Sequence, residues 1–501
     1  MSSTENEKAR ILELRQKHIG SNVSLHFASS TPLLILKGEK EFLFDEHGSS
    51  YLDCVNNVAH VGHCHPHVVA ATTRQCSALN TNSRYLHPAL VDYSARLAKT
   101  FPVAAKLEIV FWVNSGSEAN DLALRLAKEH TKKRGVICVE AAYSGHTDRL
   151  IGISPYKYDR KGGIGRPKSW VKEAPLPDVY SGKFRGDITD DSLGQKYAAE
   201  VDKLLSEYDL DVKAEQKLKS MRDARLALSG DKGADEESLA MRYLDECLLQ
   251  DDGLSTGCGA FIMESILSCG GQVMPPAGYL KRVYNSVRKH GGICIADEVQ
   301  VGFGRVGSTF WGFELQGPDV LPDIVTVGKP IGNGFPVAAV ITTREIAKSF
   351  DNGMEYFNTF GGNPVSAAVA HAVLDVIERE KLQENALKVG KVLIEGFHAL
   401  YAEFASAPVC IGSVRGTGLM VGLECIKGER NGNREPDGEC CIAVKLHAYT
   451  HHKILLSTDG MFDQVIKLKP PMCFTEEDAK NTCLAIREGL LLVKERRMRN
   501  E

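Results

Sequence analysis

Two short apolar runs in the second half of the chain each end close to a charged residue. Residues 293–296 precede Asp297, and residues 324–327 are separated from Lys329 by a single glycine. Ligands of open α/β sheets bind outside the carboxyl ends of the strands, so both charges are expected at one crevice. An amine and a carboxylate there suit pyridoxal 5'-phosphate, with the lysine on its aldehyde and the aspartate at its ring nitrogen. We therefore expect Lys329 and Asp297 to be catalytic.

Each of these two residues also has an ordinary structural explanation. An aspartate after a strand is most often a turn former or a helix cap, and a lysine is usually a solvated surface charge. A lysine that closes an apolar strand fits that explanation less well, because burying an unpaired ammonium is costly.

A glycine-containing turn follows the apolar run at 109–113 and precedes a helical pattern of apolar residues. It reads Asn-Ser-Gly-Ser-Glu-Ala-Asn and includes Gly116 and Ser117. The start of a helix exposes unpaired N–H groups and favours an anion, so these two residues could hold a phosphate. A simple strand-to-helix turn with a serine cap is the alternative.

Tyr143 lies beyond the apolar run at 136–139. Its ring could stack on a flat ring of a ligand, or it could pack where two domains meet.

The periodicity predicts an α/β chain with two structural parts. Strands alternate with helical stretches from about residue 66 to 340, which indicates βαβ units and a mainly parallel sheet. Strands are expected at 109–113, 136–139, 260–263, 293–296, 324–327 and 337–341. We expect a large domain over 61–344 and a smaller α+β domain built from 1–60 and 345–501. Residues 187–257 are rich in Asp, Lys, Glu and Ser and are expected to form a surface insertion or a mobile loop, although parts of the segment could form amphipathic helix.

Composition narrows the class of protein. The 501 residues are 43% hydrophobic and 25% charged, as in soluble globular proteins, and the net charge of -4 gives no support for nucleic-acid binding. We find no apolar run of about 18 residues, so no membrane span is expected. The 14 cysteines lack a regular spacing and indicate buried apolar residues in an intracellular protein. The polar N-terminus contains two glutamates in its first ten residues, which argues against a signal or transit peptide.

One histidine-rich stretch could suggest a metal site. It contains His60, His63, Cys64, His65 and His67. Pro66 fits the first turn of a helix, and alternating histidines need not converge on one point. We expect no metal there.

Taken together, the motifs resemble the class-III aminotransferases, which are fold-type-I pyridoxal phosphate enzymes. The matching segments are Gly-His-Cys-His-Pro (62–66), the 114–120 turn, Ala-Asp-Glu-Val-Gln-Val-Gly-Phe-Gly-Arg (296–305), the Lys329 segment and Phe-Asn-Thr-Phe-Gly-Gly-Asn-Pro (357–364). The resemblance implies a Schiff-base lysine at 329, Asp297 at the pyridine nitrogen and Tyr143 stacked on the ring. It also implies cofactor contacts from Gly116, Ser117, Glu264 and Gln300, and from Thr359 of a neighbouring subunit, which would make the active unit a homodimer.

Within this family the chain is similar to phospho-lyases that act on phosphoethanolamine or 5-phosphohydroxylysine. The matching stretches are 56–66, 80–87, 275–279 and 469–475. Family members that are ordinary transaminases place an arginine three residues before a Pro-Pro pair, where it clamps a substrate carboxylate; here that residue is Lys467. A lysine is a point charge and lacks the planar fork of arginine. Arg84 and then Lys467 are our candidates for binding the substrate phosphate, although Arg84 could equally form an ordinary salt bridge. Ser144 and Phe335 depart from the family pattern, which usually has histidine at the first position and, in similar phospho-lyases, at the second.

Three functions follow as alternatives. The preferred one is a phospho-lyase that takes a small phosphorylated amine, and the second is a transaminase that moves an amino group to a keto acid such as pyruvate or glyoxylate. The third is an inactive scaffold, against which the intact pair of Lys329 and Asp297 argues. Family members of this kind imply a mitochondrial location, whereas the N-terminus favours the cytoplasm.

Overall fold

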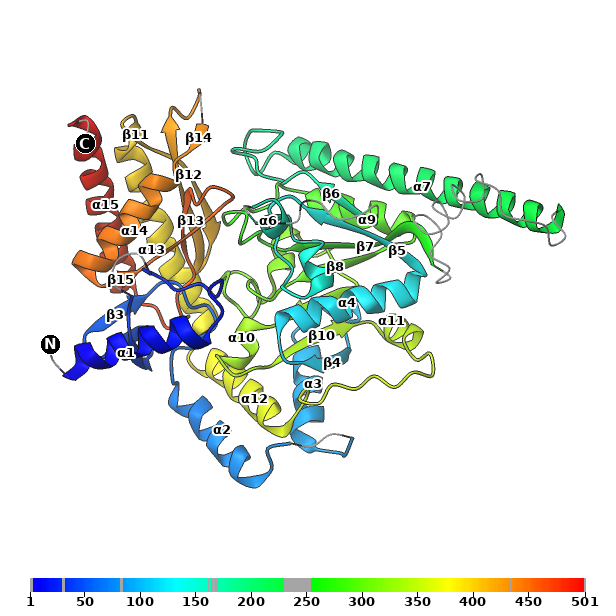
Figure 1. Ribbon diagram of the computed structural model, residues 1–501, viewed down its shortest axis with the longest axis horizontal. Coiled ribbons are helices and arrows are strands. Elements are labelled where there is room, and N and C mark those ends of the chain that lie inside the picture. Colours follow the sequence, from blue (N-terminus) through cyan, green and yellow to red (C-terminus); the bar gives the residue numbers. More distant parts are fainter. Residues whose placement is uncertain are drawn as a thin grey trace.

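The largest sheet of the computed structural model has seven strands, in the order β4-β10-β9-β8-β7-β5-β6 (Figure 1). The structure describes residues 3–28, 32–81, 84–160, 162–163, 165, 170–228, 254–432 and 434–499. Neighbouring strands are parallel except β10, which is antiparallel to β4 and β9. This confirms the expected α/β class. The strands are β4 Ile109–Val113, β5 Lys133–Val139, β6 Val171–Ala174, β7 Ser255–Glu264, β8 Ile293–Asp297, β9 Ile324–Val327 and β10 Ala338–Thr342.

Helices cover both faces of this sheet, because successive side chains of a buried strand point to opposite faces. On β5, Val136 and Cys138 belong to the apolar layer of α4 (Gly116–Thr131). Ile137 and Val139 belong to the layer of α7 (Asp191–Leu228) and α9 (Tyr279–Lys289). Beyond β9 and β10 the core continues into α2 (Pro66–Ala78), α3 (Pro88–Ala98) and α12 (Pro364–Arg379). The shorter helices are α5 Asp148–Ile151, α6 Pro155–Tyr158, α10 Lys329–Gly332, α11 Arg344–Ser349, η1 Val103–Ala105 and η2 Gly312–Gln316.

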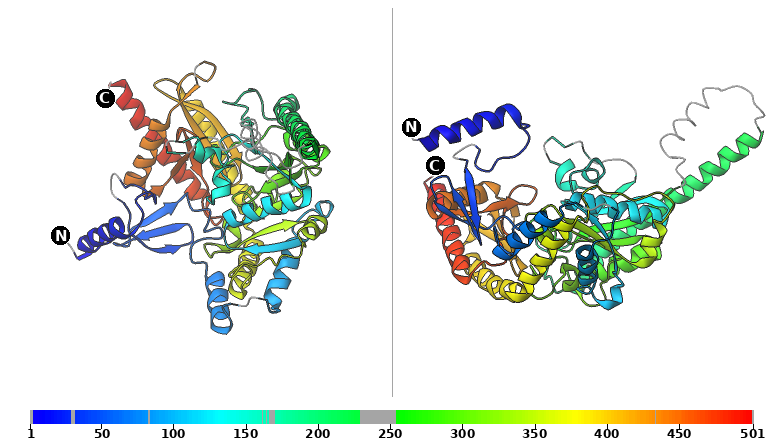
Figure 2. Two further views of the ribbon diagram at one scale, coloured as in Figure 1. Left: turned by 45° about the vertical axis from the view of Figure 1, so that its right-hand side comes forward. Right: turned by 90° about the horizontal axis from the view of Figure 1, so that it is seen from below.

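The segment 187–257, where a surface insertion is expected, contains a long helix in its first part. Residues 191–228 form the single helix α7, and its first half packs against α9 and β7. Its inward residues recur at helical spacing and are at most 3% exposed: Leu193, Tyr197, Ala198, Val201, Leu205 and Tyr208. This period is that of an amphipathic helix with a buried face, which the high content of charged residues obscured. Beyond this contact α7 extends away from the body (Figure 2), and residues 229–253 lie outside the described part of the chain.

Two smaller sheets lie outside the large one: the first combines N-terminal and C-terminal strands, and the second is C-terminal. The first has the order β1-β2-β3-β15, and β15 (Ile454–Leu455) pairs in parallel with β3 (Ser50–Asp53). The second has the order β11-β12-β13-β17-β16, with β14 added on β13. The remaining strands are β1 Ile35–Glu39, β2 Phe42–Asp45, β11 Ala405–Ser406, β12 Val409–Thr417, β13 Met420–Gly428, β14 Arg434–Pro436, β16 Ser457–Asp459 and β17 Val465–Leu468. The helices on this side are α1 Ser3–His18, α13 Leu382–Glu403, α14 Gly438–His452 and α15 Glu476–Met498.

Within the described residues, none of the helices combines the length and the apolar character needed to cross a lipid bilayer.

Candidate active site

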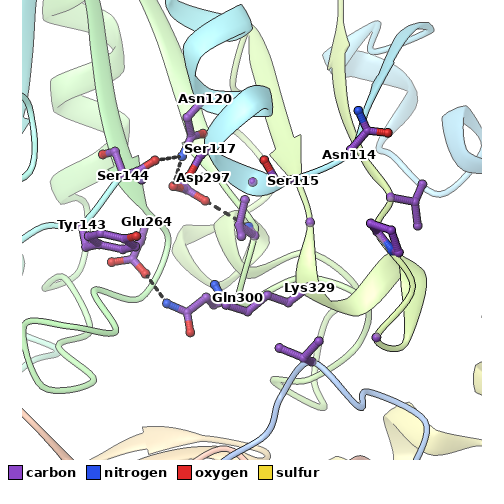
Figure 3. A pocket seen from close by; sticks show the side chains of 18 of the residues that line it. Asn114, Ser115, Ser117, Asn120, Tyr143, Ser144, Glu264, Asp297, Gln300 and Lys329 are labelled. Carbon is purple, nitrogen blue, oxygen red and sulfur yellow. Dashed lines mark hydrogen bonds between the residues drawn. The ribbon is translucent and has the colours of Figure 1, made fainter. Parts of the chain in front are cut away.

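Three charged side chains reach one cavity from the carboxyl ends of adjacent strands. Glu264 ends β7 and is the register partner of Asp297, which ends β8. Lys329 begins α10 one residue after the glycine that follows β9. All three line a cavity of about 280 Å³, and Figure 3 shows Asp297 and Lys329 on different strand ends around it. The structure therefore brings together the amine and the carboxylate that the sequence pointed to.

Asp297 is held as a hydrogen-bond acceptor inside the protein. Its Oδ2 accepts from Asn120 Nδ2 at 2.7 Å, and its Oδ1 accepts from the Val299 N–H at 3.0 Å. Burial raises the pKa of Asp297, whereas these two donors and the positive charge of Lys329 lower it. Both hydrogen bonds go to the carboxylate form and favour it. A carboxylate fixed in this way can hold a proton on a bound heterocycle.

The start of α4 borders the cavity and could hold an anion there. Ser115 caps the helix, with its Oγ accepting from the Glu118 N–H at 3.1 Å. The N–H groups of Gly116 and Ser117 lie in the first turn, where a helix has no acceptor of its own for them. A Cβ on Gly116 would lie 2.6 Å from Val299 Cγ1, so only glycine lets this turn sit so close to the strand end.

An aromatic residue borders the same cavity. Tyr143 follows β5 and lines the cavity together with Val299. Burial is the main reason why the pKa of Tyr143 is raised. The Tyr143 ring meets Tyr156 edge to face, with centroids 6.5 Å apart, and the Tyr156 hydroxyl donates to Asp459 at 3.2 Å. Tyr143 is therefore fixed in position to cover one side of a flat ring.

Gln300 and Glu264 form a buried polar pair in the wall of the cavity. Gln300 Nε2 donates to Glu264 Oε1 at 3.3 Å, and Asn57 Nδ2 donates to Gln300 Oε1 at 3.2 Å. Burial, followed by the charge of Asp297, raises the pKa of Glu264 to about 8. Glu264 is thus mostly protonated at neutral pH and adds little negative charge beside Asp297.

Three predicted residues do not line the cavity of a single chain. Arg84 is on the surface, where it pairs with Glu355 at 2.8 Å and lies over the ring of Phe357 at 4.4 Å. Thr359 is exposed in the segment that leads into α12. Lys467, near the end of β17, forms an ion pair with Asp459, the same carboxylate that Tyr156 contacts.

The side chains of the histidine-rich stretch do not gather around one point. His60 contacts the Phe303 carbonyl at 2.9 Å, and His63 contacts Asp53 at 2.7 Å. The other two reach separate carboxylates of α12 and its end, with His65 at Glu380 and His67 at Asp375. Each of the four histidines thus contacts a different residue.

Sequence reasoning missed three residues of this site. Asn120 lies one helical turn after Gly116, a spacing that places both at the same end of α4 and could have identified it. Val299 follows the Asp297 motif directly. Lys469 is buried behind Gln300, and no local pattern identifies it, because its contact depends on how β17 packs against the large sheet.

This set of groups fits pyridoxal 5'-phosphate. An amine for its aldehyde, a carboxylate for its ring nitrogen, a helix start for its phosphate and an aromatic face all border one cavity.

Comparisons with known proteins agree. The family model Aminotransferase class-III matches residues 26–490. The chain is 45% identical over 99% of its length to "Alanine--glyoxylate aminotransferase 2-like" of Drosophila melanogaster and covers 90% of that protein. It is 39% identical over 97% of its length to "Ethanolamine-phosphate phospho-lyase homolog 1" of Caenorhabditis elegans and covers 94% of it. A solved phospholyase from Arthrobacter in complex with phosphoethanolamine has a TM-score of 0.79 and 31% identity, with 96% of this chain and 99% of that chain covered. The chain therefore belongs to the class-III aminotransferases and has their fold-type-I architecture and their cofactor, pyridoxal 5'-phosphate.

Proposed function

We propose that this enzyme is an ammonia-releasing phospho-lyase. Its substrate would carry an amine on one carbon and a phosphate on the next, as phosphoethanolamine and 5-phosphohydroxylysine do. With phosphoethanolamine and water, the products would be acetaldehyde, ammonia and inorganic phosphate. The similarity to proteins named as phospho-lyases, one of them solved with phosphoethanolamine, supports this choice over other reactions of the family.

The observation that carries the proposal is the lysine at position 467. Lys467 lies near the end of β17 and forms an ion pair with Asp459. Asp459 also accepts a hydrogen bond from Tyr156, whose ring contacts Tyr143. A guanidinium would bind a carboxylate through two parallel hydrogen bonds, and a lysine cannot do so. A substrate with no carboxylate at the reacting carbon does not need that clamp, whereas a phosphate still benefits from a nearby cation.

The roles of the chain's own residues follow from their positions. Lys329 would bind the cofactor covalently and, once the substrate amine has displaced it, would act as the base that removes a proton from the amine-bearing carbon. Asp297 would keep a proton on the ring nitrogen, and Gly116 and Ser117 would hold the cofactor phosphate. When bound, the cofactor supplies an electron sink for the charge that develops on that carbon. Tyr143 would keep water from one face of the ring.

A transaminase is the second candidate, because the family name and many relatives carry that activity. The two reactions share the proton removal by Lys329 and differ in where the amino group goes. Purified enzyme with bound cofactor should be mixed with phosphoethanolamine or 5-phosphohydroxylysine, with and without pyruvate or glyoxylate. Amine transfer to the keto acid without phosphate release would favour the transaminase.

We also propose that two chains share their active sites. Several large apolar side chains beside Arg84 and Thr359 are exposed to solvent, including Tyr85 at 82%, Leu86 at 97% and Phe360 at 65%. Apolar groups of this size in one region are typical of protein interfaces. A second copy on this face would carry Thr359, and with it Arg84, toward the partner's cavity.

A further inference from the structure

A buried lysine lies directly behind the cavity wall. Lys469 follows β17, is 3% exposed, and its backbone N–H donates to the Cys54 carbonyl at 2.9 Å. Its ammonium donates to Ser268 Oγ at 2.8 Å and to Gln300 Oε1 at 2.6 Å. Among the described residues it forms no ion pair with a carboxylate, in contrast to Lys467 two positions earlier. The charge is therefore buried against neutral acceptors.

This contact decides which way the Gln300 amide points. An amide can present either its oxygen or its nitrogen to a neighbour, and its partners determine the choice. An ammonium only donates, so the Gln300 oxygen must face Lys469, and Asn57 donates to the same oxygen. The Gln300 nitrogen is left to face Glu264 and the cavity. Without the ammonium, only the contacts with Asn57 at 3.2 Å and Glu264 at 3.3 Å would hold the amide in this orientation.

The buried ammonium of Lys469 is not expected to stabilise the fold more than an apolar side chain would. Burial and the charge of Lys467 lower the pKa of Lys469 to about 7, although the charge of Asp459 opposes this. Replacing a buried charged group by an apolar side chain of similar length is often neutral or stabilising. A methionine would fill the same space without the desolvation penalty.

We infer that Lys469 is a positioning residue, which fixes the Gln300 amide so that a donor faces the bound cofactor. This inference rests on the proposed placement of Gln300 beside the cofactor. It assigns Lys469 a role in the reaction although the residue does not line the cavity.

The test compares Lys469→Met, Gln300→Ala and the double variant as enzymes with bound cofactor. The first readout is the midpoint of the pH titration of cofactor absorbance. We expect both single variants to shift this midpoint in the same direction, by about one pH unit for loss of an oriented donor. The double variant should shift it no further than Gln300→Ala does, because one residue acts through the other.

The second readout separates positioning from structure. Lys469→Met should leave the melting temperature of the cofactor-free protein unchanged or raise it, while it slows the reaction at least about tenfold. The matched control is Lys172→Met, which removes a part-buried lysine from a contact with α7 and should change neither the titration nor the rate. An unshifted titration in Lys469→Met, or shifts that add in the double variant, would overturn the inference. The titration needs only the cofactor, so it decides this point even if the wild type releases no phosphate and the proposed reaction is wrong.

Discussion

Two opposing effects act on the pKa of Asp297. Burial disfavours its charge, while Asn120, the Val299 N–H and Lys329 favour it. A carboxylate about 4 Å from a protonated ring nitrogen, at an effective dielectric of about 20, contributes about 4 kcal/mol. In the proposed role of Asp297, that interaction would keep the ring protonated and able to accept charge.

Replacing this acid should therefore abolish most of the activity. Asp297→Asn keeps the size of the side chain and removes the charge, so we expect turnover to fall by about a thousandfold, as about 4 kcal/mol implies. The rate of product formation with saturating cofactor measures this. Asp319→Asn, at a carboxylate that pairs with Lys281 on the surface, is the control and should keep the wild-type rate. A tenfold loss or less in Asp297→Asn would contradict the assigned role.

The raised pKa of Glu264 predicts that the stability of the protein depends on pH. Its pKa is raised from 4.5 to about 8, so the folded protein keeps a proton that the unfolded chain has already lost. The contribution of this group to stability therefore falls as the pH rises from about 4.5 to about 8. Glu264→Gln removes this dependence, so the variant should gain melting temperature relative to the wild type as the pH is raised through that range. The comparison uses the cofactor-free protein, and a difference that does not change with pH would refute it.

At the scale of elements, apolar runs in the sequence predicted where the strands lie. They did not predict which residues from distant strands touch. The strands at 109–113 and 324–327 have the predicted bounds, because β-branched and aromatic residues there are flanked by charged residues, an asparagine or a glycine. The start of α4 also follows from its serine cap and glycine. The contact between Lys469 and Gln300 was not predictable, since it joins residues 169 positions apart through the packing of β17.

The helix α7 leads to a prediction about stability, because one of its faces packs on the large sheet. Leu205 is fully buried in the layer between α7 and the sheet, whereas Leu210 is 63% exposed on the same helix. Leu205→Ala should lower the free energy of unfolding by about 2–5 kcal/mol, as for other buried leucines. Leu210→Ala is the matched control and should change it by less than about 0.5 kcal/mol. Urea unfolding of both variants measures the difference, and equal values would mean that α7 is dispensable.

At the scale of the whole molecule, a shared active site predicts complementation between inactive subunits. Lys329→Ala removes the covalent lysine, and Thr359→Ala would remove the contact made to the partner's cofactor. Subunits of the two variants, mixed and allowed to exchange, should regain about a quarter of wild-type activity, because half of the dimers then hold one intact site. Activity that stays at the level of the separate variants would show that each chain supplies its own site.

The phospho-lyase claim is tested most directly by the products of one substrate. Purified enzyme with bound cofactor and phosphoethanolamine, without any keto acid, should release inorganic phosphate and ammonia in equal amounts, and Lys329→Ala should release neither. No phosphate release under these conditions, with amine transfer once pyruvate or glyoxylate is added, would contradict the account.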